Sequence, residues 1–421
     1  MNQAALDALL ARAQRDGRLP SVVGGVAVDG QTVWTGAAGQ VVGVPADVQY
    51  RIGSITKSMT AVMVLQAMRD GLVDLDQPLS AYVEEAPYAD RTVRDLLSHS
   101  SGIATEPIGP WWERSTRSWA QLQANTAVLA EPGEHYLYSN LAYGLLGELL
   151  QRVRGVDWAS LVTRDVLTPL GMTRTSYLPQ SGHATGYSVH YLLSTLTPEP
   201  NNDTGAMAAA GQLWSTVGDL LIWACFLLDG HESVLSRDLV ALMATPHAPG
   251  GTYGLGLQLV TSGSGLMIGH TGTMPGFMAK IQVDRARRRA AVVLANGTVG
   301  LDPNGLTGAM LDLPESVDRV GEPWLPSLEV PTEAAAMVGR WYWGHRPHDA
   351  IWSHGELVVQ SLSPHDELER FTWASGEWVD SMGVALQVEY DEGGKPRWWW
   401  FDTYLFTREP YDVAAPIPGG L

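Results

Sequence analysis

Ser54 and Lys57 have the residue types and the spacing of a nucleophile and its base. They lie in the segment QYRIGSITKSMTAVMVLQAM, residues 49–68, where a glycine precedes an apolar run that is predicted to form a helix. Residues three apart share one helical face, so the Lys57 amine is expected to point at the Ser54 hydroxyl. An amine acts as a base near neutral pH only where burial or positive charge lowers its pKa, and the apolar run supplies burial. The plain alternative is a serine N-cap beside a surface lysine.

Two further motifs accompany this pair. Tyr138 and Asn140 form the only Tyr-x-Asn of the chain, in YLYSN just before a helical run. His270, Thr271 and Gly272 form a His-Thr-Gly triplet that leads into the strand-like segment MAKIQV. A serine–lysine pair also arises by chance, so these two companions carry the interpretation further than the pair alone.

In this order the three motifs resemble those of the penicillin-binding protein and class C β-lactamase superfamily of serine enzymes. That family uses Ser-x-x-Lys, Tyr-x-Asn, and Lys-Thr-Gly or His-Thr-Gly. The likeness covers most of residues 20–300 and is carried by the segments RIGSITKSMTA, TVRDLLSHSSGI, PGEHYLYSN, TPLGMTRT, AAAGQLWSTVGDL and GHTGTMPGF.

The resemblance implies a role for each motif residue. Ser54 would attack an acyl carbonyl and form a covalent acyl-enzyme. Lys57 and Tyr138 would act as general base and acid, with Tyr138 relaying a proton to the leaving group. Asn140 would orient Lys57 and the substrate amide.

The resemblance also implies backbone groups around the substrate. The N–H groups of Ser54 and Thr273 would hold the tetrahedral oxyanion, each contributing about 3–4 kcal/mol to the barrier. Gly272 would keep its strand free of a side chain, so that the substrate backbone lies close. Thr271 of the same triplet is included among the substrate-binding residues.

The chain departs from the family pattern at His270, where β-lactamases and peptidoglycan transpeptidases usually carry lysine. A fixed ammonium suits a substrate carboxylate, whereas histidine is only partly charged near neutrality. This departure favours the esterase, peptidase and acyltransferase relatives over an antibiotic hydrolase. The structural alternative is that His270 only packs against Tyr138.

Residues 107–119, PIGPWWERSTRSW, fall where this family builds a loop beside the cleft. Trp111 and Trp112 are read in two ways. They either form the core of a folded-back loop or make an aromatic rim for an apolar acyl or peptide substrate.

The elements that must hold these motifs are helices set between two groups of strands. Residues 21–43 are predicted to form a hairpin that turns at Asp29-Gly30. Helical patterns then run from residue 54 to about residue 228, and strand patterns return at residues 279–283 and 290–294. This order predicts an α/β (α+β) fold in which one antiparallel sheet, built from both termini of the domain, is covered by an all-helical region. With the resemblance, the expected fold is DD-peptidase/β-lactamase-like.

The C-terminal part differs in character. Proline and acidic residues dominate residues 312–333, which read as a linker, and short strand-like segments with regular turns follow. These segments predict a small C-terminal all-β barrel of lipocalin-like type. The expected domains are residues 1–315, a linker at 316–332, and residues 333–421. Eight of the 16 tryptophans lie in residues 331–421, either as core or as an aromatic wall over a cleft.

Composition limits the partners. The formal net charge is −18, with 27 Lys and Arg against 45 Asp and Glu, so nucleic acid and anionic membrane surfaces are not expected partners. The first 20 residues lack the apolar core of a secretory signal, and the longest apolar run, residues 220–228, is too short to span a bilayer. A cytoplasmic protein is expected.

No metal or cofactor is expected. His345 and His348 are three apart but lie in a proline-containing loop, and no His-Glu-x-x-His occurs. The single cysteine, Cys225, has only apolar neighbours and is interpreted as a buried thiol. No Gly-x-Ser-x-Gly is present, which argues against an α/β-hydrolase elbow.

The resulting hypothesis is a serine hydrolase or acyltransferase acting on an ester or peptide acyl group. A narrower alternative is a penicillin-binding-protein-type thioesterase that releases and cyclises nonribosomal peptides from a carrier protein. In that alternative Arg408 of the β domain would hold the peptide carboxylate by a bidentate contact. A non-catalytic sensor on the same fold is the third reading, although Ser54, Lys57 and Tyr138 are all retained.

Overall fold

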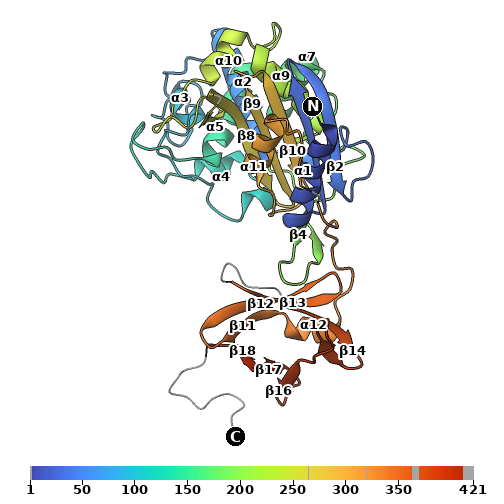
Figure 1. The fold of residues 1–421 in the computed structure, drawn as a ribbon. Coiled ribbons are helices and arrows are strands. Elements are labelled where there is room, and N and C mark those ends of the chain that lie inside the picture. Colours follow the sequence, from blue (N-terminus) through green and yellow to red (C-terminus); the bar gives the residue numbers. More distant parts are fainter. Residues whose placement is uncertain (1, 264, 319, 363–368, 411–421) are drawn as a thin grey trace. The chain divides into compact units, whose positions relative to one another are not determined.

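The computed structural model describes residues 2–263, 265–318, 320–362 and 369–410 (Figure 1). They form two compact units. The first comprises residues 1–188 and 198–324, and the second comprises residues 189–197 and 325–421. The expected domains, residues 1–315 and 333–421 with a linker at 316–332, are continuous in sequence, whereas these units are not. Residues 189–197, which lie inside the expected first domain, belong with the second unit.

The first unit is built on a six-stranded antiparallel sheet with the strand order β2-β1-β10-β9-β8-β7. Its strands are β1 (Ser21–Val28), β2 (Gln31–Gly39), β7 (Gln258–Ser262), β8 (Gly265–Met274), β9 (Phe277–Asp284) and β10 (Arg289–Ala295). The N-terminal hairpin joins the C-terminal strands through β1 and β10, as the sequence predicts. Asp29 and Gly30 both have positive φ, at 51° and 79°, which suits a two-residue hairpin turn.

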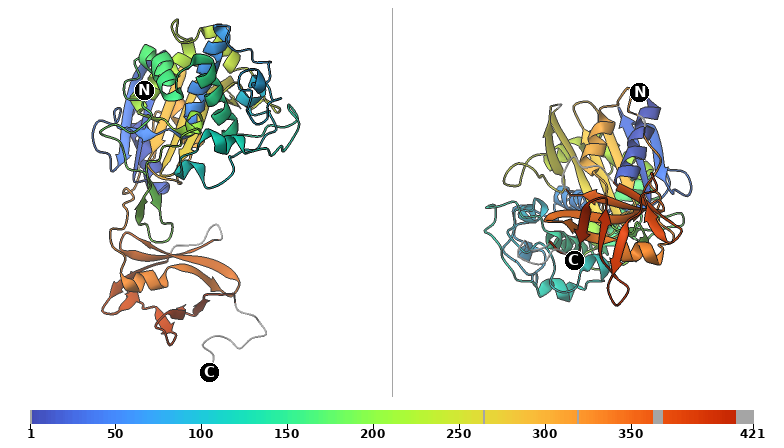
Figure 2. Two further views of the ribbon diagram at one scale, coloured as in Figure 1. Left: turned by 180° about the vertical axis from the view of Figure 1, so that it is seen from behind. Right: turned by 60° about the horizontal axis from the view of Figure 1, so that its bottom comes forward.

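Helices cover both faces of this sheet (Figures 1 and 2). On one face α1 (Gln3–Asp16) and α11 (Pro303–Leu311) share an apolar cluster with the strands. The other face meets the larger cluster, which includes α2 and the remaining helices of the unit. Those helices are α2 (Thr56–Arg69), α3 (Val93–Leu97), α4 (Trp119–Gln123), α5 (Asn140–Arg154), α6 (Trp158–Val162), α7 (Thr168–Leu170), α8 (Ala208–Gly211), α9 (Val217–Asp229) and α10 (Arg237–Met243).

Short elements connect these layers. They are the 3₁₀ turns η1 (Gly53–Ile55), η2 (Leu79–Ala81) and η3 (Trp112–Arg114), the π-helical turn η4 (Thr163–Leu167), and the strand pairs β3 (Tyr50–Arg51) with β6 (Trp214–Ser215) and β4 (Tyr187–Val189) with β5 (Leu196–Pro198). The apolar run at residues 220–228 forms most of α9, a core helix, and Cys225 is a free thiol packed at the edge of that core. Within the described residues, no helix combines the length and the apolar composition needed to cross a bilayer.

The second unit is a curled eight-stranded antiparallel sheet, a half-barrel, with its own apolar core. Helix α12 (Thr332–Met337) contributes Ala334 and Met337 to that core, and the Trp341 indole donates a hydrogen bond to the Met337 carbonyl. The strands are β11 (Gly339–Trp343), β12 (Arg346–Ser353), β13 (Glu356–Ser361), β14 (Glu369–Ala374), β15 (Glu377–Val379), β16 (Gln387–Tyr390), β17 (Pro396–Phe401) and β18 (Tyr404–Thr407).

Candidate active site

Ser54 lies in the η1 turn that leads directly into α2, and two glycines let strand β8 approach this turn. Gly53 has φ of 49°, and a Cβ there would lie 2.7 Å from the backbone nitrogen of Thr273. A Cβ on Gly272 would lie 1.9 Å from the Ile52 carbonyl oxygen and 3.2 Å from the Ser54 nitrogen. Gly272 therefore faces the serine turn, and its missing side chain brings β8 against Ser54.

Lys57 is the second residue of α2 and has no exposed surface. Its Nζ lies 2.8 Å from Ser54 Oγ, 2.7 Å from Asn140 Oδ1 and 2.7 Å from the Ala210 carbonyl oxygen. Thr60, on the next turn of α2, donates to the Ala209 carbonyl at 2.8 Å and so fixes α8 alongside. Helices α2 and α8 are thus held together around one amine, and Ser54 remains partly exposed.

Burial lowers the pKa of Lys57 from its ordinary 10.5 to about 7, and the carboxylates of Glu106 and Glu113 oppose part of that shift. The cause is the cost of holding an ammonium away from water. At neutral pH a large share of this lysine is therefore an unprotonated amine.

Tyr138 packs beside the same amine, with its ring centroid 5.0 Å from Lys57 Nζ. Burial raises the pKa of Tyr138 well above its ordinary value, while interaction with the Ser54 hydroxyl opposes the shift in part. The phenol consequently stays protonated across the physiological range and can donate a proton.

His99 supports Tyr138 and was not assigned from the sequence. Its ring is fully buried, with its centroid 4.2 Å from that of Tyr138, and its Nδ1 accepts the backbone N–H of Ser139 at 3.0 Å. His99 has φ of 59°, so its backbone is held in a conformation that costs energy. The segment LLSHSSGI was noted for its family likeness, but nothing in its pattern reveals that this ring reaches Tyr138.

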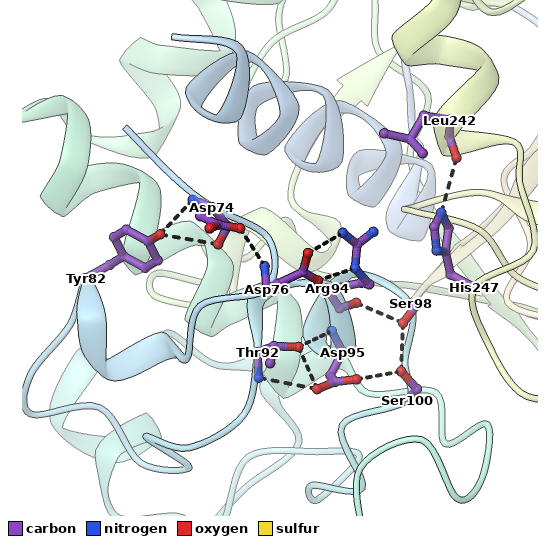
Figure 3. Close-up of polar contacts among 10 residues, drawn as sticks. All are labelled: Asp74, Asp76, Tyr82, Thr92, Arg94, Asp95, Ser98, Ser100, Leu242 and His247. Carbon is purple, nitrogen blue, oxygen red and sulfur yellow. Dashed lines mark hydrogen bonds and ion pairs between the residues drawn. The ribbon is translucent and has the colours of Figure 1, made fainter. Parts of the chain in front are cut away.

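Figure 3 shows what holds the His99 segment in place. A capping box joins Thr92 and Asp95 at the start of α3. Asp95 accepts from Ser100 Oγ at 3.2 Å, and Ser98 and Ser100 hydroxyls lie 2.8 Å apart. The residues on either side of His99 are therefore tied back to the helix, which stabilises the strained conformation between them.

His270 lies in β8 and is buried. Its Nδ1 donates to the Thr271 carbonyl oxygen at 2.5 Å, because that oxygen can only accept, and its Nε2 lies 2.8 Å from the Tyr253 hydroxyl. Burial lowers the pKa of His270 to about 3. The ring is neutral near pH 7, and its centroid lies 6.2 Å from that of Tyr138.

Thr271 and Thr273 follow on the same strand. The ladder between β7 and β8 reaches Gly269, and beyond it the Gln258 side chain accepts from the Thr271 N–H at 3.0 Å and donates to its hydroxyl at 2.9 Å. Thr271 is thus tied to Gln258 instead of the Lys57 cluster. Thr273 has an exposed side chain, and its N–H is the backbone donor next to the serine turn.

The two tryptophans of the loop take different positions. Trp112 is 4% exposed, and its indole donates to Glu106 Oε2 at 2.6 Å. Trp111 is 51% exposed, donates to Glu113 Oε2 at 2.5 Å and stacks under the Arg114 guanidinium. Trp112 therefore belongs to the folded loop, and Trp111 presents an aromatic surface to solvent.

Glu106 was also missed from the sequence. Its Oε1 accepts from Asn140 Nδ2 at 2.6 Å, so it touches the Tyr-x-Asn motif directly. Glu106 lies in the loop GIATEPIGP, which has no periodic pattern and no motif. Its contact with Asn140 is therefore visible only in the structure.

Arg408 belongs to the second unit. Its guanidinium stacks 3.7 Å from the Trp341 ring centroid and donates to the Ala336 carbonyl at 2.7 Å. Both contacts are internal to that unit. The described residues hold no group of three or more His, Cys, Asp or Glu side chains arranged for a metal ion.

Comparisons with known proteins cover both units. A family model described as Beta-lactamase matches residues 6–312, and one described as a domain of unknown function (DUF7586) matches residues 330–408. Among curated proteins, the D-alanyl-D-alanine-carboxypeptidase/endopeptidase AmpH of Escherichia coli K12 is 33% identical over 191 residues, 41% of this chain and 47% of AmpH. Protein flp of Staphylococcus aureus MRSA252 is 27% identical over 267 residues, 59% of this chain and 52% of flp. The chain spans about half the length of the curated relatives it matches.

Solved structures share the fold. The octameric penicillin-binding protein homologue of Pyrococcus abyssi has a TM-score of 0.68 at 23% identity and covers 96% of this chain and 100% of its own. A class C beta-lactamase has a TM-score of 0.65 at 19% identity, and the match covers 75% of this chain and 97% of the beta-lactamase. SurE has a TM-score of 0.63 at 25% identity. The match covers 97% of this chain and 99% of SurE, and therefore extends across both units.

Proposed function

Because the chain belongs to the beta-lactamase family of serine hydrolases, we propose that it transfers acyl groups through a covalent ester on Ser54, to water or to an amine. The observation that carries this proposal is the buried Lys57 amine 2.8 Å from the Ser54 hydroxyl, with a pKa lowered to about 7.

The surroundings of Lys57 support a role as base. A neutral amine has two N–H donors and one lone pair. Two of its three neighbours, Asn140 Oδ1 and the Ala210 carbonyl, are oxygens that only accept, so they take the two N–H groups. The lone pair is left for the Ser54 O–H, whose proton it accepts as Oγ attacks the carbonyl carbon.

The remaining steps use groups beside this pair. The N–H groups of Ser54 and Thr273 stabilise the oxyanion, worth about 3–4 kcal/mol per donor. The protonated Tyr138 phenol donates to the leaving group and is reprotonated from Lys57. Water or an amine then attacks the ester, with the same residues working in reverse.

Charge at the site limits the substrate. His270 is neutral and buried, so it offers no fixed cation to a carboxylate, and Glu106 places negative charge near Lys57. We therefore propose esters, amides or peptides without a carboxylate at the His270 position, with cephalosporins as poor substrates. The similarity to the carboxypeptidase AmpH and to a D-amino acid amidase of Ochrobactrum anthropi, 25% identical with a TM-score of 0.59, supports testing D-configured amides.

Fluorophosphonate labelling tests the proposal without knowledge of the substrate. We expect one covalent adduct on the wild type, located at Ser54 by peptide mass mapping, and none on Ser54→Ala. A screen of esters, D-amino acid amides and a chromogenic cephalosporin then ranks substrates. A folded wild type that takes no label would favour the sensor reading instead.

A second candidate is a thioesterase that cyclises peptides carried on a protein. The His-Thr-Gly triplet and the appended β unit favour this candidate, and SurE, which was also solved with D-Leu, is similar across both units. Peptide N-acetylcysteamine thioesters should then yield macrocycles, whereas linear acid alone would rule the cyclase out.

Arg408→Met should reduce cyclisation and spare ester hydrolysis if Arg408 holds the carboxylate. Equal loss of both activities would point instead to its contacts with Trp341 and Ala336.

A further inference from the structure

Asn140 has two chemically different ends, and the structure assigns a partner to each. Its Oδ1 faces Lys57 Nζ at 2.7 Å, and its Nδ2 faces Glu106 Oε1 at 2.6 Å. A carboxylate oxygen only accepts hydrogen bonds, so it can face the NH₂ end and not the carbonyl end. Glu106 therefore decides which way the carboxamide points.

That orientation matters for the amine. If the carboxamide were turned over, Nδ2 would donate to the Lys57 lone pair and compete with the Ser54 hydroxyl for it. One N–H of Lys57 would also lose its acceptor. Only the observed orientation leaves the lone pair directed at Ser54.

Hydrogen bonds hold both carboxylate oxygens of Glu106 and also its backbone carbonyl, and Oε1 is the atom that accepts from Asn140. Oε2 accepts the indole N–H of the buried Trp112 at 2.6 Å, and the Glu106 backbone carbonyl accepts from Asn125 Nδ2 at 2.9 Å. The carboxylate is thus fixed by a packed loop although the residue is exposed. An exposed position also means that substitution removes little core packing.

We propose that Glu106 is a positioning residue: it fixes the Asn140 carboxamide and thereby aims the Lys57 lone pair at Ser54. This inference rests on the proposed acyl transfer through Ser54. It assigns Glu106 no contact with the substrate.

Charge provides a second, independent signature. The Glu106 carboxylate raises the pKa of Lys57 against the effect of burial. Removing that charge lowers the pKa of Lys57. In a plot of reaction rate against pH, the rising part at low pH (the acid limb) therefore moves to lower pH, and the constant rate above it is the alkaline plateau. A residue that served only to pack the loop would leave this limb in place.

The experiment measures the rate at which a fluorophosphonate phosphonylates Ser54, with loss of fluoride, from pH 5 to 9 for three variants of the full chain. Glu106→Ala should reduce the alkaline plateau on the order of 10- to 100-fold, because the base is misdirected. Glu106→Gln should move the acid limb to lower pH with a smaller loss of plateau. Glu106→Asp keeps the charge but withdraws the oxygens, so its plateau should fall while the limb stays.

Glu113→Gln is the matched control. Glu113 lies in the same loop and its charge also acts on Lys57, but its carboxylate accepts a hydrogen bond from the Trp111 indole and does not hold Asn140, whose Nδ2 donates to Glu106. The alkaline plateau of Glu113→Gln should equal that of the wild type, while the acid limb of its pH–rate profile moves to lower pH. Thermal melting of each variant checks folding.

Plateaus of folded Glu106→Ala and Glu106→Asp equal to wild type would overturn the inference. An unlabelled wild type would instead overturn the proposed acyl transfer itself, so the two failures are distinguishable.

Discussion

At the scale of single residues, Lys57 is a lysine with no exposed surface, and its neighbours explain why it can be buried. One backbone carbonyl, one amide carbonyl and one hydroxyl surround the amine, and no carboxylate of the described residues forms an ion pair with it. Such an environment accepts N–H groups but does not neutralise a full charge. The neutral amine is therefore the form that these contacts suit.

The pH profile of acylation follows from this environment. Because the base must be unprotonated, the fluorophosphonate rate should rise with pH through a midpoint near 7, the pKa of Lys57. Rates measured at constant ionic strength from pH 5 to 9 check the midpoint. A flat profile, or a midpoint near 10, would contradict the assignment of Lys57 as base.

Lys57→Ala should slow acylation by about 100-fold or more, because a general base typically contributes on the order of 10²–10⁴. Lys57→Arg should fail as well, since a guanidinium keeps its proton in proteins. Ser54→Ala serves as the zero-rate control. Acylation at the wild-type rate in either lysine variant would refute the base assignment.

Lys57 also makes stability depend on pH. Its folded pKa of about 7 lies below its ordinary 10.5, so its burial costs most stability at and below pH 7, and the cost declines as the pH rises toward 10.5. Relative to the wild type, Lys57→Ala should therefore be more stable at pH 6 than at pH 9.5. Urea unfolding at both values measures the difference, and an unchanged difference would contradict the lowered pKa.

At the scale of elements, the site depends on how closely β8 approaches the turn before α2. Gly272 and Gly53 remove the side chains that would separate Thr273 from Ser54. The strand is fixed on its other side by β9, where Gly272 pairs with Ala279, and by the Gln258 side chain, which continues hydrogen bonding where β7 stops. The distance between the two proposed oxyanion donors, the N–H groups of Ser54 and Thr273, therefore depends on how the strand packs against the turn.

Gly272→Ala tests this packing. Its Cβ would lie 1.9 Å from the Ile52 carbonyl, so β8 or the serine turn must shift and the two N–H groups separate. Acylation should fall by about 100- to 1,000-fold, the usual effect of losing one oxyanion donor. Gly308→Ala in α11 is the control: no atom lies within 4 Å of its Cβ, so stability should rise by about 0.5–1 kcal/mol with activity unchanged. Wild-type acylation by Gly272→Ala would exclude this role of β8.

At the scale of the whole molecule, the chain has two units with separate apolar cores. The clusters around the six-stranded sheet share no residue with the cluster inside the half-barrel. Ser54, Lys57, Tyr138, Asn140 and His270 belong to the first unit. Each core can therefore unfold in its own transition.

Differential scanning calorimetry should accordingly resolve two transitions. Fluorophosphonate labelling of Ser54 should change the temperature of one and leave the other in place. The transition that responds to labelling is assigned to the unit that contains Ser54, and the other transition to the second unit. A single transition, shifted as a whole by labelling, would show that the two units unfold together.

Local patterns in the sequence were sufficient for the features that depend on neighbours along the chain. The Asp29-Gly30 hairpin, the core helix α9 and the pairing of terminal strands into one antiparallel sheet follow from turn chemistry and periodicity, and the structure confirms them. Ser54 and Lys57 are three residues apart, so helical geometry alone predicts their contact, which the structure contains.

Tertiary structure alone decided the rest. Glu106, His99 and the Ala210 carbonyl reach the site from loops and helices far apart in sequence, and no local pattern records which residues long-range folding brings together. The neutral state of His270 and the burial of Trp112 beside an exposed Trp111 were likewise undetermined, because charge state and exposure depend on the atoms packed around a side chain. The assignment of residues 189–197 to the second unit has the same origin, since contacts, and not chain order, define a core.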